Sequence, residues 1–200
     1  MQNQQPSQTS RYPDMTLATG KVAWLDAPEM TDIELSDFEA PVQNICRYNG
    51  NYKWPLVKHL ALGVFLSNYH FPGGDRMIPA YFAAHDLHEC IVGDMVSGLK
   101  AFCPGFTAIE NAWERHVHAS LGLHMERNPD SNKTKYLDLR CLVIEMTMLG
   151  HPAADHVAAK FGGPMLEEER HAFSAVNALD TETCWRVVAK VIQDVTNGKD

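Results

Sequence analysis

The 200-residue sequence has little positive charge and no long apolar stretch. Lysine and arginine number 17 against 25 aspartate and glutamate residues, which gives a net charge of -8. Because nucleic acids and anionic membranes attract basic surfaces, we expect neither as a partner. No apolar run reaches the roughly 18 residues of a membrane-spanning helix. The polar first residues lack the apolar centre of a secretion signal, so we expect a cytoplasmic protein.

Paired cysteines and nucleotide-binding glycine motifs are also missing. The five cysteines show no Cys-x-x-Cys spacing and are odd in number, which predicts reduced thiols that mostly fill the core. No glycine-rich phosphate-binding loop and no zinc-finger spacing occurs. Length and the 45% apolar content predict a single globular domain over 14–200, after a flexible tail at 1–13.

Apolar residues recur at helical intervals along most of the chain, which predicts an all-α bundle. The expected helices cover 36–48, 54–69, 77–92, 107–121, 136–149 and one or two segments within 166–196. Thr107 and Glu110 are of the type that caps a helix start. Strand-like alternation is confined to 16–26, where we expect a small strand pair or a short extended arm.

Side chains that can do chemistry are concentrated in 81–100. Five of them fall within ten residues: His85, Asp86, His88, Glu89 and Asp94. Because residues three or four apart share a helical face, His85 and Glu89 should lie together. Imidazole and carboxylate groups offer nitrogen and oxygen ligands to a divalent cation. A solvated acidic helix is the alternative, but the apolar lead-in over 77–84 disfavours it.

The segment 136–149 is apolar almost all round, yet it contains Asp138, Arg140 and Glu145. Charges in a buried helix need partners, because transfer of an unpaired charge out of water is costly. This makes Asp138 a better candidate for a metal ligand than an average aspartate.

The order of these residues resembles a known family. His59, the pair His85-Asp86 and the later Asp138 are similar to the H…HD…D signature of HD-domain metal-dependent phosphohydrolases. The likeness covers about 16–149 and includes DIELSDFEAPVQNICRYNG, WPLVKHLALG and AAHDLHECIVGDMVSGLK. It implies an HD-domain helical bundle. Within that family, the sequence resembles bacterial 5'-deoxynucleotidases and small phage enzymes that hydrolyse dATP.

The resemblance also implies roles for individual residues. It implies four ligands of one divalent transition metal, namely His59, His85, Asp86 and Asp138. It implies two catalytic carboxylates, Glu89 and Asp94, and three substrate-binding residues, Arg47 and Lys100 for phosphate and Tyr48 for the deoxyribose. Lys58 is a further phosphate-binding candidate, with a solvated lysine as the alternative. Cobalt, manganese, zinc, iron and nickel all suit such a ligand set, and magnesium could accompany a triphosphate.

The expected function is hydrolysis of dATP to deoxyadenosine and triphosphate, because Lys58 and Lys100 could hold the outer phosphates. The alternatives are a 5'-deoxynucleotidase that acts on deoxynucleoside monophosphates and a non-catalytic nucleotide sensor. The sequence departs from common relatives beside His59, at Lys58 and Leu60, which leaves the substrate open. The resemblance further implies a homo-oligomer with a small-molecule deoxynucleotide as its partner.

Overall fold

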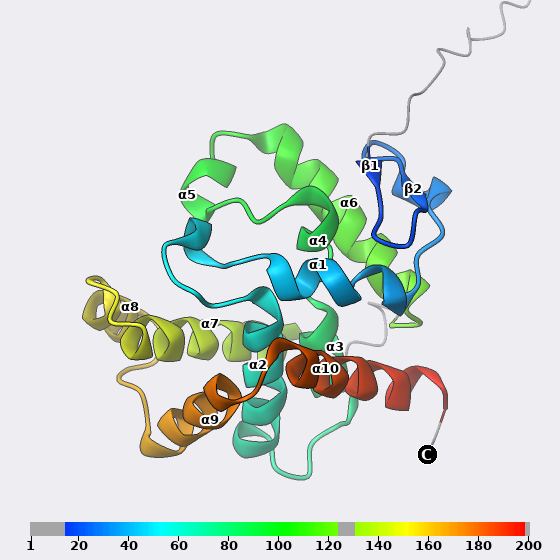
Figure 1. Cartoon of the computed structure of the whole chain (residues 1–200). Coiled ribbons are helices and arrows are strands. Elements are labelled where there is room, and N and C mark those ends of the chain that lie inside the picture. The colour runs from blue at the N-terminus through cyan, green and yellow to red at the C-terminus, as the bar shows by residue number, and fades with distance from the viewer. Residues whose placement is uncertain (1–14, 124–130, 199–200) are drawn as a thin grey trace, which may run out of the picture.

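The computed structural model describes residues 15–123 and 131–198, and the tail expected at 1–13 lies outside them. The described part is mostly helical (Figure 1), which confirms the all-α class. No helix in this part is long and apolar enough to cross a membrane.

The N-terminal segment forms a small strand pair, one of the two alternatives expected for it. Strand β1 (Met15–Thr16) pairs antiparallel with β2 (Val22–Ala23). Two short 3-10 helices follow, η1 (Pro28–Met30) and η2 (Leu35–Asp37), before α1 (Glu39–Asn44). The helix expected over 36–48 is therefore much shorter. The carboxylate of Asp37, just before this helix, accepts hydrogen bonds from the Glu34 backbone and from Lys21.

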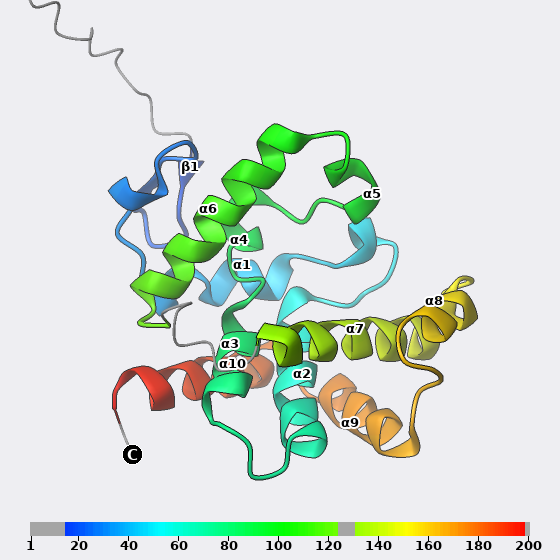
Figure 2. The same cartoon turned by 180° about the vertical axis from the view of Figure 1, so that it is seen from behind.

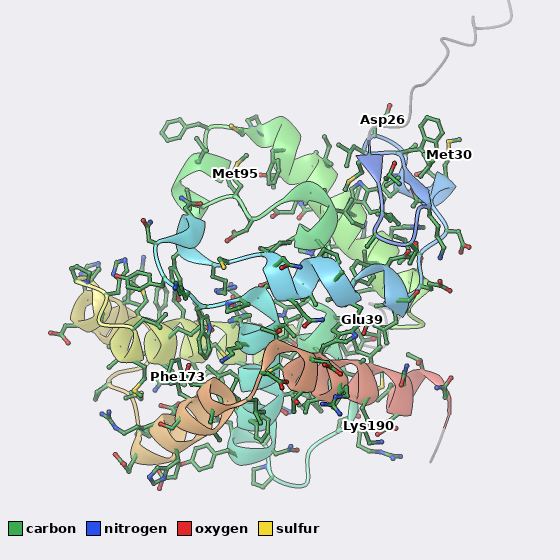
Figure 3. All side chains as sticks on the ribbon, in the orientation of Figure 1. Asp26, Met30, Glu39, Met95, Phe173 and Lys190 are labelled. Atoms are coloured by element: carbon green, nitrogen blue, oxygen red, sulfur yellow. The ribbon has the colours of Figure 1, made fainter. Side chains whose placement is uncertain are left out.

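The core is built around α2 (Leu56–His70), which packs against α3 (Met77–Ala84), α9 (Glu167–Ala178) and α10 (Thr181–Thr196). The helices α2 and α3 approach closely at Gly63, where an added Cβ would lie 1.9 Å from the ring of Phe82. Phe173, labelled in Figure 3, extends from α9 and stacks on Trp54 with 4.5 Å between ring centroids. This packing fixes α2, which carries His59.

The remaining helices are α4 (Glu89–Val92), α5 (Ser97–Lys100), α6 (Pro104–Ser120), α7 (Ser131–Met148) and α8 (Ala154–Lys160), with the 3-10 turn η3 (Tyr48–Gly50) before α2. Both views show α5 and α6 on one side of α1 and α7 to α10 on the other (Figures 1 and 2). Because α6 begins at Pro104, Thr107 and Glu110 lie within the helix and the capping prediction was wrong.

The helix expected over 77–92 is divided in two. Between α3 and α4, residues 85–88 form a turn in which backbone hydrogen bonds span three residues, from Leu87 to Ala84 and from Glu89 to Asp86. The Phe82 carbonyl, an ordinary helix acceptor, receives a hydrogen bond from Nδ1 of His85 at 2.6 Å. The side chain of His85 therefore competes with the backbone ladder at the point where the helix breaks.

Candidate metal centre

Four of the side chains singled out in the sequence meet at one point, and we call them the His–Asp cluster: His59, His85, Asp86 and Asp138. Nε2 of His85 lies 3.1 Å from Oδ2 of Asp86, and Nε2 of His59 lies 3.6 Å from the same oxygen. Oδ1 of Asp138 is 3.7 Å from Nε2 of His59. Helix α2, the turn after α3 and helix α7 thus each contribute to the cluster.

The geometry of three members suits a metal ion. One ligand atom from each of His59, His85 and Asp86 lies within 4.8 Å of the others, so this group could hold a cation. Asp138 stands beside it as a fourth oxygen donor. The mixed nitrogen and oxygen set is compatible with several divalent transition metals and does not select one.

The two imidazoles are oriented so that Nε2 is available. Nδ1 of His59 lies 2.7 Å from Oε1 of Glu145, and Nδ1 of His85 lies 2.6 Å from the Phe82 carbonyl. Since both partners accept, Nδ1 donates in each ring, and Nε2 is the nitrogen that faces the cluster. Burial lowers the pKa of His85, but the charge of Asp86 outweighs it and raises the pKa to about 9, so a cation at this point would replace the proton on Nε2. Both Nε2 atoms are buried, and the Asp86 carboxylate is beside each of them without forming a well-aligned hydrogen bond. Two imidazole nitrogens that converge on one carboxylate fit a bound cation.

Glu145 supports this arrangement from behind. The carboxylate is fully buried, and it accepts a hydrogen bond from the Tyr48 hydroxyl at 2.8 Å and pairs with Nε of Arg47 at 3.2 Å. Burial alone would raise the pKa of Glu145, but the charge of Arg47 and the contact with His59 outweigh it and lower the pKa to about 2. Glu145 is therefore ionised and fixes the ring of His59, as carboxylates behind metal-ligating histidines do.

Arg47 and Tyr48 belong to this supporting network. Nη1 of Arg47 lies 3.3 Å from Oδ2 of Asp86, so the guanidinium joins the carboxylates of Asp86 and Glu145. Burial raises the pKa of Tyr48, and the charge of Glu145 adds to the effect. Neither residue is part of the cavity wall described below. Their placement does not support the expected contacts with phosphate and deoxyribose.

A cavity of about 310 Å³ opens beside the His–Asp cluster. His85, Asp86 and Asp138 reach its wall, and α3, the turn at 85–88, α4, α5, α6 and α7 contribute the remaining lining. Figure 2 shows α6 and α7 on either side of the α3–α4 segment. The cavity gives a small ligand access to the cluster.

Glu89 lies in this cavity next to the cluster. Its side chain is buried, and Oε2 has no hydrogen-bond partner. Burial and the negative charges of Asp86 and Asp94 raise the pKa of Glu89 to about 9. The carboxyl can therefore hold a proton at neutral pH, and a cation beside Asp86 would lower this pKa again by offsetting the negative charge.

Asp94 and Lys58 lie outside the main cavity. Asp94 is on the loop between α4 and α5, where it lines a neighbouring hollow with Asn49 and Leu99. It is near enough for its charge to act on Glu89. Lys58 donates to the Asn177 carbonyl on α9 at 2.9 Å. The position of Lys58 does not support the phosphate-binding role expected for it, because its ammonium is held against α9.

Two lysines line the cavity, and each contacts a carboxylate. Nζ of Lys100 lies 2.5 Å from Oε1 of Glu110, and Nζ of Lys135 lies 2.6 Å from Oδ2 of Asp138. Burial lowers the pKa of Lys100, but the contact with Glu110 more than compensates and the pKa is raised overall. Sequence reasoning missed Lys135 and the role of Glu110. The signal for Lys135 was its helical spacing of three residues from Asp138.

Comparison with known proteins does not assign the chain to a family. No model of a known protein family matches the sequence, and a search of curated proteins finds no match. The resemblance to HD-domain phosphohydrolases therefore stays a prediction from motifs. The arrangement of side chains in the cluster and the cavity is the evidence on function.

Proposed function

We propose that the protein is a metal-dependent phosphohydrolase of deoxynucleotides with an HD-type fold. The observation that carries the proposal is the convergence of the buried Nε2 atoms of His59 and His85 on the Asp86 carboxylate, with spacing that suits a cation, beside an accessible cavity. A divalent cation bound there supplies a Lewis acid that polarises a phosphoryl oxygen and makes water a better nucleophile.

Residues of the cavity supply the rest of the chemistry. Glu89 is the group that accepts or donates the proton, because it is buried beside the cluster and its pKa responds to nearby charge. Lys100 and Lys135 bring positive charge to the cavity wall, where they can neutralise phosphoryl oxygens. Asp94 acts on Glu89 through its charge from the adjacent loop.

The proposal also has to decide whether the substrate is a monophosphate or a triphosphate. The case for a triphosphate depended on Lys58 and Lys100, and Lys58 is held by the Asn177 carbonyl on α9. Lys135 takes its place on the cavity wall, but Lys100 and Lys135 are both already paired with carboxylates. Because little positive charge is left for outer phosphates, a deoxynucleoside monophosphate is the favoured substrate and dATP is the second candidate. The resemblance of the motifs supports a deoxynucleotide in both cases.

The decisive experiment loads the full chain with manganese, cobalt or zinc and incubates it separately with dAMP and dATP. Separation of products by anion-exchange chromatography distinguishes release of inorganic phosphate from release of triphosphate. We expect consumption of dAMP, and Asp86→Asn should abolish it. Bound metal without turnover of either nucleotide would refute the enzyme and favour a nucleotide sensor.

A further inference from the structure

Polar side chains gather on the side of the cavity formed by α6. We call this side the α6 wall, and it consists of Glu110, Asn111, Glu114 and His118. Asn111 and Glu114 are three residues apart and share a helical face. Among residues 15–123 and 131–198, no hydrogen-bond or ion-pair partner engages either of these two side chains. They are therefore available to a ligand.

A second observation indicates a polar ligand in the same cavity. His88 also lines the cavity and is only 5% exposed; its Nε2 lies 3.7 Å from Oε1 of Glu110, and its Nδ1 has no hydrogen-bond partner. The hydroxyl of Thr134, also on the lining, is likewise buried without a partner. Unpaired buried polar atoms are unfavourable. Several of them around one cavity imply a ligand with hydrogen-bonding groups beyond its phosphate.

The α6 wall does not form a second metal centre. Within the described part of the chain, His59, His85 and Asp86 are the only group of histidine, cysteine or acidic residues with metal-binding geometry. Glu110 is already paired with Lys100. Glu114 lies one helical turn beyond Glu110, about 6 Å along the axis, so it stands further from the Lys100 ammonium than Glu110 does.

We propose that Asn111 and Glu114 recognise the base of the deoxynucleotide and select bases with an exocyclic amino group. A carboxylate only accepts hydrogen bonds, so Glu114 matches the amino group of adenine or cytosine. The carbonyl at the same position in hypoxanthine or uracil presents lone pairs and is repelled. The amide of Asn111 can both donate to and accept from the neighbouring ring nitrogen. This inference rests on the proposed function and adds which bases the enzyme prefers.

The test compares two pairs of substrates that differ in this one group, dAMP with dIMP and dCMP with dUMP. With the metal-loaded full chain, we expect kcat/KM to be about tenfold higher for the amino member of each pair, the effect of one hydrogen bond to a charged group. Glu114→Gln should reduce the preference to about twofold or less, because the amide can also donate to a carbonyl. The matched control Glu182→Gln, on the exposed start of α10, should keep the preference.

The outcomes separate this inference from the proposed function. Equal kcat/KM within both pairs, or a preference that survives Glu114→Gln, would overturn base recognition and leave the hydrolase intact. Absence of turnover with every nucleotide would refute the hydrolase. In that case calorimetric binding of the same four nucleotides decides the inference: a preference for amino bases that Glu114→Gln removes supports it, and equal affinities overturn it.

Discussion

Oε1 of Glu145 lies 2.7 Å from Nδ1 of His59, on the side of the ring opposite Asp86 and Asp138. Both side chains are fully buried, so the carboxylate determines which nitrogen of His59 carries the proton. A donor at Nδ1 leaves a lone pair at Nε2, which is the form that binds a metal. Glu145 thus prepares His59 without entering the ligand set.

The first prediction concerns Glu145 itself. Glu145→Gln keeps the shape of the side chain but weakens the hold on His59, so we expect metal affinity to fall by about 10- to 100-fold. Competition with a chromophoric chelator measures the change. Glu182→Gln, at an exposed site on α10, is the charge-matched control. Metal affinity equal to wild type in a folded Glu145→Gln protein would contradict the role assigned to this carboxylate.

Asp86 and Glu89 should separate metal binding from turnover. Asp86 lies within 3.6 Å of both imidazole Nε2 atoms, so Asp86→Ala should lose metal and activity together. Glu89 faces the cavity, so Glu89→Gln should retain metal and lose about 10²- to 10⁴-fold in kcat, the usual contribution of an acid–base group. Elemental analysis and initial rates on dAMP measure the two properties. Loss of metal in Glu89→Gln would instead make Glu89 a ligand.

Much of the fold could be predicted from the sequence, whereas the meeting of all four members of the His–Asp cluster was expected from the resemblance to HD-domain phosphohydrolases. Helical periodicity and the burial of charge in 136–149 were sufficient to single out Asp138, because an apolar helix that carries a charge must direct it to a partner. The turn at 85–88 was not predicted. Its cause is the hydrogen bond from His85 to the Phe82 carbonyl, a side-chain choice that apolar periodicity does not encode.

The positions of the lysine and arginine side chains were the least predictable feature of the site. Lys58 is adjacent to His59 in sequence, but neighbours along a helix point about 100° apart, and Lys58 reaches α9 rather than the cavity. Arg47 and Tyr48 are held by Glu145, a contact between segments 97 residues apart for Tyr48. Such distant partners depend on packing of the whole bundle, so the sequence indicated only that Glu145 needed a partner.

The close approach of α2 and α3 gives a prediction on stability. Gly63→Ala would place a methyl group 1.9 Å from the Phe82 ring, so we expect overpacking to cost about 1–3 kcal/mol of unfolding free energy. Because Phe82 packs against His59 and His85, metal affinity should fall as well. Gly105→Ala, with open space around its site on α6, is the control. Urea unfolding measures the stability of the two variants. Equal unfolding free energies for Gly63→Ala and Gly105→Ala would contradict the close packing at Gly63.

A buried ion pair away from the cluster predicts how stability depends on pH. Burial alone would raise the pKa of Glu169, but hydrogen bonds from His70 and Arg140 outweigh it and lower the pKa to about 2. Since the unfolded carboxyl titrates near 4.5, the pair stabilises the fold above that pH and the effect is lost as the pH falls toward 2. The stability gap between wild type and Glu169→Gln should therefore narrow between pH 5 and about 2, as measured by denaturant unfolding, and a constant gap would contradict this.

The last prediction contrasts the two lysines that were expected to bind phosphate. Lys100 lines the cavity, whereas Lys58 donates to a backbone carbonyl of α9. Lys100→Ala should lower kcat/KM for dAMP by about 10- to 100-fold, because it removes a charged hydrogen-bond donor to phosphate. Lys58→Ala, the matched control, should stay within about twofold, since a surface contact of this kind contributes little to a distant site. Steady-state kinetics at fixed ionic strength separates the two. If Lys58→Ala lost as much activity as Lys100→Ala, substrate would have to extend toward α9, and the longer triphosphate would become the favoured substrate.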